Sequence, residues 1–189
     1  MGIDRTAVTA IVVAGGRSHR FGRDKLEEQI GGRRLLDGSL DAARACADSV
    51  IVVGPPRGGL PPDVIAVQEQ PAYSGPFAAV ATALPLVEAG VVMVLAGDLL
   101  DPGPMLPLLL AALEADPEAE VAVTVDVEGR RQPLLAAFRT AALRAGVAGV
   151  DPQDRGAYTL LDGLRIVEVH DPSHWSHDID VAEDLPHGG

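Results

Sequence analysis

The chain has 189 residues, of which 47% are hydrophobic and 22% are charged. These values are typical of a globular protein, exclude a disordered chain, and allow one domain with a hydrophobic core. The formal net charge of −12 opposes binding to nucleic acid backbones and to anionic membranes. We therefore expect a single domain over residues 1–189, with neither nucleic acid nor a membrane as a partner.

Cysteine usage and the first residues bear on the cellular compartment. Cys46 is the single cysteine, so no disulfide can form within the chain, which fits a reducing environment. The apolar stretch near the N-terminus is too short to cross a membrane and leads into a glycine pair instead of a cleavage site. We therefore expect a cytoplasmic protein.

Apolar runs rich in Val and Ile alternate along the chain with segments in which Leu and Ala recur at helical spacing. Such runs predict buried strands, and such spacing predicts amphipathic helices. The predicted strands are 7–14, 49–54, 64–68, 91–96, 121–127, 131–139 and 164–169. The predicted helices are 35–47, 77–88, 103–115, a segment from 141 onward, and 181–185. Pro85 is expected to kink or shorten the helix in which it falls.

The alternation of strands and helices predicts the α/β class, as a Rossmann-like three-layer sandwich with a mostly parallel sheet. Aromatic residues make up only 3% of the chain, so the core consists of Val, Leu, Ile and Ala, as is typical of parallel strands covered on both faces. Residues 128–130 form an expected turn between two strands. The sheet is therefore expected to contain an antiparallel segment.

The first predicted strand ends at Gly15–Gly16, and a run of donors and positive charges follows: Arg17, Ser18, Arg20, Arg23 and Lys25. Glycine allows a sharp turn and a close backbone approach. In an open α/β sheet, ligands bind at this end of the strands. Backbone N–H groups and Arg or Lys side chains together can share the charge of a polyphosphate. The loop therefore predicts a phosphate-binding site, although its spacing is not that of a Walker motif.

A carboxylate follows the most hydrophobic strand, at Gly97–Asp98. Magnesium prefers one or two carboxylates together with substrate oxygens, so Asp98 is well placed to hold Mg²⁺ against a phosphate. The alternative role is the N-cap of the next helix. Asp101 lies closer to the predicted helix start and is the better candidate for that cap, so we predict Asp98 as a metal ligand.

Two further segments precede predicted helices. Ser74-Gly75-Pro76 opens a helix whose N-terminal amides can face a base or a ribose, although such a segment on its own is more often a simple tight turn before a helix. Asp178 and Asp180 precede the last helix, where they can cap it, bind an acceptor or bind a metal. The sequence leaves these three roles open.

Residues 13–25, VAGGRSHRFGRDK, resemble the L-A-G-G-x-S-x-R-[FM]-G-x-D-K motif of nucleotidyltransferases of the molybdenum cofactor guanylyltransferase type. The resemblance continues through Gly75-Pro76, Asp98, Gln132-Pro133-Leu134 and residues 178–185, and thus covers nearly the whole chain in order. The Gln-Pro-Leu segment favours the guanylyl branch.

The resemblance implies that GMP is transferred from GTP to molybdopterin with Mg²⁺ as cofactor and release of pyrophosphate. It implies a nucleotide-binding N-terminal part and an acceptor-binding C-terminal part, with transient contacts to molybdoenzymes or cofactor-handling proteins. The implied nucleotide-binding residues are Ala14, Gly15, Gly16, Arg17, Ser18, Lys25, Gly75 and Asp98. The implied catalytic residues are Arg20, Lys25 and Asp98, with Asp98 as the metal ligand, and the implied acceptor-binding residues are Gln132, Asp178 and Asp180.

Two alternatives remain at this point. One is a related enzyme that uses CTP or another phosphorylated acceptor, against which the Gly15-Gly16 pair weighs, since the cytidylyl variant more often has Ala-Gly. The other is a catalytically silent nucleotide-binding module, against which the joint presence of Arg20, Lys25 and Asp98 weighs. Base choice is left open, because residues 69–74 do not single out the acidic residue with which family members read guanine.

Overall fold

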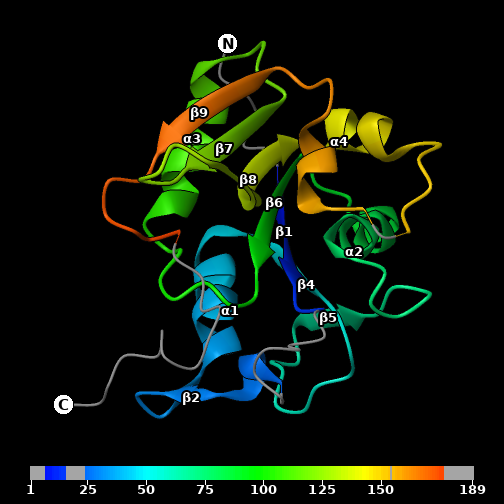
Figure 1. Cartoon of the computed structure of the whole chain (residues 1–189), viewed down its shortest axis with the longest axis vertical. Coiled ribbons are helices and arrows are strands. Elements are labelled where there is room, and N and C mark those ends of the chain that lie inside the picture. Colours follow the sequence, from blue (N-terminus) through cyan, green and yellow to red (C-terminus); the bar gives the residue numbers. More distant parts are fainter. Residues whose placement is uncertain (1–6, 16–23, 154, 177–189) are drawn as a thin grey trace.

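A seven-stranded sheet forms the centre of the computed structural model, which describes residues 7–15, 24–153 and 155–176 (Figure 1). The strand order is β5-β4-β1-β6-β8-β7-β9. The strands are β1 (Val8–Val13), β4 (Ser49–Val53), β5 (Val64–Val67), β6 (Val91–Ala96), β7 (Val121–Val125), β8 (Arg131–Arg139) and β9 (Ile166–His170). Neighbouring strands are parallel except that β8 runs antiparallel to both β6 and β7. The predicted α/β class and mostly parallel sheet are confirmed.

Helices cover both faces of this sheet, which gives three layers (Figure 1). Alternate residues of β1 point to opposite faces, and both sets are buried. Ala10 and Val12 pack with α1 (Leu35–Cys46) and α3 (Met105–Ala115). Ile11 and Val13 pack with α2 (Pro76–Ala83), α4 (Thr140–Val147) and the 3-10 turn η3 (Ala157–Leu161).

A tight turn after β7 explains why β8 reverses direction. Asp126 accepts hydrogen bonds from the backbone N–H groups of Glu128 (3.0 Å) and Arg130 (2.8 Å). Gly129 completes the turn with a φ of 81°, a conformation that glycine adopts without strain. A connection this short can join only antiparallel strands. The hairpin expected at residues 121–139 is therefore present.

Several predicted boundaries differ from the structure. Helix α2 ends at Ala83 and continues as the 3-10 turn η2 (Leu84–Leu86), so Pro85 shortens the helix as expected. Helix α3 begins at Met105 with Pro104 at its N-cap and no side-chain cap, so the expected capping role of Asp101 is wrong. The carbonyl of Pro102 instead accepts from the backbone N–H of Met105.

The short elements that were not predicted include η1 (Lys25–Glu27), β2 (Gln29–Ile30) and β3 (Arg33–Arg34). Elements of two or three residues are too short to show a hydrophobic period. The helix predicted at 181–185 lies outside the described residues. Within the described part of the chain, no helix has the length and apolar character needed to span a membrane.

The strand register places several chain segments at one edge of the sheet. Val13 is level with Val53 of β4 and with Ala96 of β6. The residues that follow these strands therefore emerge side by side. Strand β8 starts at the same edge, because Leu135 is level with Leu95.

Candidate active site

The backbone at the end of β1 is held between its two neighbouring strands. The N–H of Ala14 donates to the carbonyl of Val53 (2.7 Å), and the N–H of Gly97 donates to the carbonyl of Val13 (2.9 Å). A Cβ atom on Gly54 would lie 2.5 Å from the carbonyl oxygen of Ala14 and 2.9 Å from the nitrogen of Gly15. Only glycine at position 54 therefore permits this close approach, which fixes the Ala14–Gly15 backbone at the ligand-binding edge.

An ion pair joins two of the predicted catalytic residues. Lys25 opens η1, Asp98 follows β6, and the Lys25 Nζ atom contacts Asp98 Oδ2. Their side chains are 19% and 16% exposed, so the pair lies in a partly desolvated position. Leu26 is buried and lies against Gly97, which brings η1 close to the end of β6. The structure thus places a cation and a carboxylate beside the Ala14–Gly15 backbone.

A buried glutamate that the sequence did not single out lies over this backbone. Glu69 follows β5 and is only 2% exposed. Its Oε1 atom accepts from the N–H of Tyr73 (2.9 Å), and a Cβ atom on Gly15 would lie 3.2 Å from Oε1. Its Oε2 atom is buried and has no hydrogen-bond partner among the described residues. A buried carboxylate oxygen without a donor is costly, so this atom is a candidate for contact with a ligand.

Gly75 connects the Glu69 turn to helix α2. It is the N-cap of α2, has a φ of 96°, and supplies no side-chain cap. A Cβ atom there would lie 2.9 Å from the carbonyl oxygen of Arg155. Both the backbone angle and the close approach require glycine at this position. The predicted contact of Gly75 with nucleotide stays a prediction.

At the start of β8, the side chain of Gln132 is oriented by Asp126. The Gln132 Nε2 atom donates to Asp126 Oδ2 (2.7 Å). Burial raises the pKa of Asp126, but hydrogen bonds from the backbone and side chain of Arg130 and from Gln132 outweigh it and hold the pKa below its ordinary value. Because a carboxylate can only accept, the amide oxygen of Gln132 faces away from it and can accept a bond from another group.

The structure brings Ala14, Gly15, Lys25 and Asp98 together and places Gly75 and Gln132 on segments at the same edge of the sheet. The remaining predicted site residues lie outside the described residues: Gly16, Arg17, Ser18, Arg20, Asp178 and Asp180. Among the described residues, no group of three or more His, Cys, Asp or Glu side chains could by itself hold a metal ion. The predicted role of Asp98 as a metal ligand stays a prediction.

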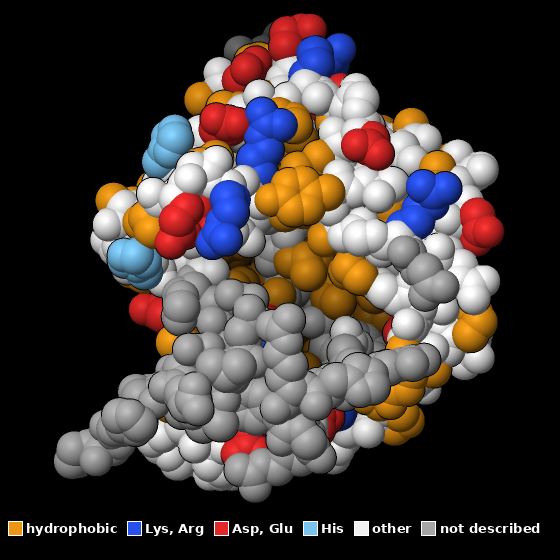
Figure 2. All heavy atoms as spheres, viewed as in Figure 1, with side chains coloured by type: hydrophobic (Ala, Val, Ile, Leu, Met, Phe, Trp, Pro, Cys, Tyr) orange, Lys and Arg blue, Asp and Glu red, His pale blue; other side chains and the backbone are white. Residues whose placement is uncertain are grey.

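Figure 2 shows that the face seen in Figure 1 is hollowed near its centre, below β8 and beside α2. Hydrophobic side chains gather in this hollow, and side chains of both charges lie along its upper edge. A planar, partly apolar ligand group can bury surface in such a hollow while its polar atoms meet the rim.

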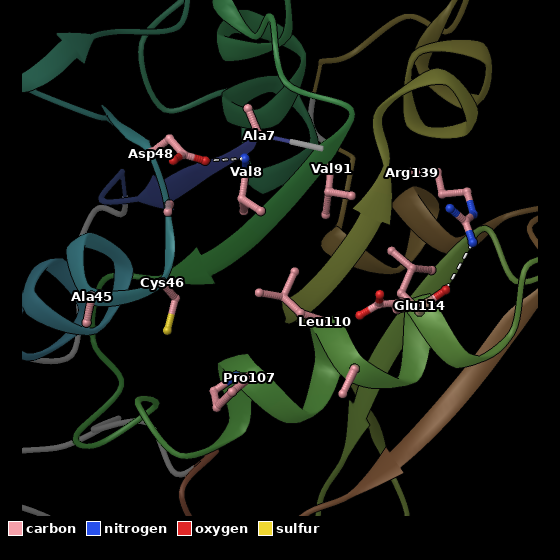
Figure 3. A pocket seen from close by; sticks show the side chains of 13 residues that line it. Ala7, Val8, Ala45, Cys46, Asp48, Val91, Pro107, Leu110, Glu114 and Arg139 are labelled. Atoms are coloured by element: carbon pink, nitrogen blue, oxygen red, sulfur yellow. Dashed lines mark hydrogen bonds between the residues drawn. The ribbon is translucent and has the colours of Figure 1, made fainter. Parts of the chain in front are cut away.

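A separate pocket of about 630 Å³ lies at the opposite edge of the sheet, at the beginning of β1 and β6 (Figure 3). Its walls include Val8, Cys46, Leu110 and Arg139. The hydrogen bonds at its edge, such as that from the N–H of Val8 to Asp48 (2.8 Å), serve the fold itself. None of the predicted site residues lines this pocket.

The chain is an α/β protein with a mostly parallel sheet, and at the carboxyl ends of its strands lie a glycine, a lysine and an aspartate. This arrangement is typical of α/β proteins that bind phosphate groups. The comparison with known families specifies the class further. The chain belongs to the family described as the MobA-like NTP transferase domain, whose model matches residues 10–170. It is therefore a nucleotidyltransferase.

The chain is similar to proteins named for the molybdenum cofactor or its guanine dinucleotide and to a protein named as a cytidylyltransferase. A probable molybdenum cofactor guanylyltransferase from Chloroflexus aggregans is 32% identical over 144 residues, which cover 72% of this chain and 67% of that protein. Molybdopterin-guanine dinucleotide biosynthesis protein A from Archaeoglobus fulgidus superposes with a TM-score of 0.71 at 19% identity, covering 94% of each chain. A 2-C-methyl-D-erythritol 4-phosphate cytidylyltransferase from Thermus thermophilus superposes with a TM-score of 0.65 at 23% identity, covering 98% of this chain and 96% of that one. The two solved structures have the same fold as this chain.

Proposed function

We propose that this nucleotidyltransferase transfers GMP from GTP to molybdopterin in a Mg²⁺-dependent reaction that releases pyrophosphate. The observation that carries the proposal is the Lys25–Asp98 ion pair beside the Ala14–Gly15 backbone. The name of the 32% identical relative supports guanylyl transfer to the molybdenum cofactor. We also propose that the protein acts in the cytoplasm and contacts molybdoenzymes or cofactor-handling proteins transiently.

The residues at the site suit phosphoryl chemistry between two anionic substrates. The nucleophile is a phosphate oxygen of the acceptor, which is already anionic at neutral pH. Such a reaction depends on alignment and on neutralisation of charge more than on a general base. Lys25 supplies a positive charge for the triphosphate, and the backbone N–H groups of the glycine loop supply donors. Arg20, which lies outside the described residues, is proposed to add a second positive charge.

Asp98 fits a magnesium ion because a single carboxylate, completed by phosphate oxygens, is the set of ligands that Mg²⁺ prefers. When bound, the ion supplies further neutralisation of the phosphate charge. Asp98 would hold the metal with the carboxylate that now pairs with Lys25. Lys25 would then be available to neutralise charge on the triphosphate.

Glu69 favours guanine over cytosine as the base. Guanine presents the adjacent donors N1–H and N2–H₂, whereas the corresponding edge of cytosine presents the acceptors O2 and N3 beside a single amino group. The buried Oε2 atom of Glu69 needs a donor, and Gly15 leaves space beside the carboxylate. Glu69 is therefore the candidate for the residue that reads guanine.

The acceptor is proposed to bind beside β8. The amide oxygen of Gln132, oriented by Asp126, is suited to an N–H donor such as those of a pterin ring. Asp178 and Asp180, which lie outside the described residues, are also proposed to bind the acceptor.

A pyrophosphate-release assay tests the proposed function. Purified protein with Mg²⁺ is incubated with GTP, CTP, ATP or UTP, each with and without molybdopterin. Release only with GTP and only in the presence of the pterin is expected. A preference for CTP would overturn the assignment of the base, and binding of GTP without any release in the presence of the pterin would indicate a silent nucleotide-binding module.

A further inference from the structure

An arginine in the Pro- and Gly-rich loop after β4 is almost completely buried. The side chain of Arg57 is only 3% exposed. Its Nη1 atom lies 2.6 Å from Asp24 Oδ2 and 2.9 Å from Glu27 Oε1. Its Nη2 atom donates to the carbonyl oxygen of Ala14 at 3.0 Å. One guanidinium therefore connects the end of β1 with the residues of η1.

These partners surround two groups that the proposed reaction uses. Ala14 immediately precedes Gly15 in the phosphate-binding backbone. Asp24 and Glu27 lie on either side of Lys25 in the sequence, and Asp24 also caps η1 by accepting from the N–H of Leu26 (3.1 Å). By holding Asp24, Glu27 and the Ala14 carbonyl at once, Arg57 sets the distance between the glycine backbone and the backbone that carries Lys25.

The loop that carries Arg57 is itself held in place. The Arg34 side chain, at the start of α1, donates to the carbonyl oxygens of Gly58 (2.8 Å) and Gly59 (3.1 Å). Arg34 is in turn paired with Asp37 at 2.8 Å. Arg34 and Asp37 thus fix the loop that carries Arg57. A side chain that orients other groups needs such support from its own neighbours.

Charge supports the same role. Asp24 and Glu27 place two negative charges next to Lys25, where a triphosphate is proposed to bind, and both carboxylates are about two-fifths exposed. Without a buried cation they would repel the substrate through a partly desolvated medium. The planar guanidinium offsets part of this charge with Nη1 while Nη2 reaches a third acceptor, whereas a lysine would have to reach all three acceptors from a single nitrogen.

We propose that Arg57 is a positioning residue for nucleoside triphosphate: it fixes the Ala14–Gly15 backbone and Lys25 in the arrangement that binds the triphosphate, without touching it. The proposal rests on the proposed function of this loop. It predicts a defect in triphosphate binding that exceeds any effect on the acceptor.

The test compares Arg57→Ala, Arg57→Lys and Arg44→Ala in the full chain. Arg44 is a matched control, because it forms a two-bond ion pair with Asp63 (3.0 and 3.1 Å) on the surface. The Kd for GTP with Mg²⁺ is measured by titration in the absence of acceptor, and KM and kcat for GTP and for molybdopterin are measured by pyrophosphate release.

Arg57→Ala is expected to raise the Kd and KM for GTP about tenfold or more, the effect of losing hydrogen bonds that involve charged groups, with the KM for the pterin little changed. Arg57→Lys keeps the charge and is expected to fold and to give an intermediate Kd. Arg44→Ala is expected to stay within about twofold of the unchanged protein, as surface substitutions do.

If the unchanged protein binds GTP and both Arg57 variants bind it as tightly, the role of Arg57 is wrong while the proposed function stands. A KM for the pterin that rises as much as that for GTP would also overturn the positioning role, because it would indicate a general loss of structure. If the unchanged protein binds none of the four nucleoside triphosphates, the proposed function fails and this inference fails with it.

Discussion

The Lys25 ammonium contacts the Asp98 carboxylate, so the proposed triphosphate-binding cation and the proposed metal ligand neutralise each other in this structure. Binding of Mg²⁺ to Asp98, as proposed, would bring the metal and Lys25 into competition for the same carboxylate. Because the ammonium and the carboxylate are paired, neither stands as an isolated charge in this partly desolvated position.

Asp98→Asn tests the metal-ligand role. The amide oxygen is a weaker ligand and carries no charge, so we expect kcat/KM for pyrophosphate release to fall about 100-fold or more. Asp101→Asn, three residues further along the chain, is the matched control and is expected to keep its activity. Turnover by Asp98→Asn near that of Asp101→Asn would contradict the assignment.

Glu69→Gln tests the reading of the base. The amide replaces one acceptor with a donor, so it cannot accept both guanine N–H groups, and we expect the preference for GTP over CTP to fall about tenfold or more. The ratio of kcat/KM for the two nucleotides measures this. Glu88→Gln, an exposed change beyond α2, serves as the control. An unchanged ratio would remove Glu69 from base recognition.

Gly54→Ala tests the close approach between β4 and the glycine backbone. The added Cβ would lie 2.5 Å from a backbone oxygen that cannot turn aside, so we expect a loss of about 1–3 kcal/mol in the free energy of unfolding, together with weaker GTP binding. Urea denaturation and nucleotide titration measure the two effects. Gly58→Ala has no atom within 4 Å of the new Cβ and is expected to change neither quantity. Equal behaviour of the two variants would show that the backbone at Ala14 yields easily.

Much of the fold was predictable from local pattern. The bounds of β6 and β8 agree with the apolar runs at 91–96 and 131–139, because buried strands need continuous apolar residues. The proximity of Lys25 and Asp98 could also be predicted, since both residues follow strands whose carboxyl ends lie side by side in the sheet.

Arg57 and Glu69 could not be assigned in the same way. Arg57 lies in a loop without any hydrophobic period, and its role depends on a contact with Ala14, 43 residues away in the sequence. The resemblance directed attention to residues 69–74 but did not assign the residue that reads the base. The burial of Glu69 and its unsatisfied Oε2 atom, which only the structure shows, single it out.

Asp171 is expected to link stability to acid pH. It is 2% exposed and accepts from the N–H of Ser173 (3.0 Å) and from the N–H and Oγ of Ser176 (both 2.7 Å). Burial raises the pKa of its carboxyl, but these hydrogen bonds outweigh burial and lower the pKa in the folded protein. A lowered pKa means that the unfolded chain binds the proton more readily. The stabilisation is therefore present above the unfolded pKa of about 3.9 and is lost as the pH falls through the folded value.

Asp171→Asn should remove this contribution. We expect the variant to be less stable than the unchanged protein at pH 7. The difference in the free energy of unfolding should begin to shrink below about pH 4, where the Asp171 carboxylate of the unfolded chain takes up its proton while that of the folded protein is still ionised. Urea denaturation between pH 7 and pH 2 measures the difference, with the exposed Asp162→Asn as control. A difference that stays constant over this range would mean that packing around Asp171, and not its charge, supports the end of β9.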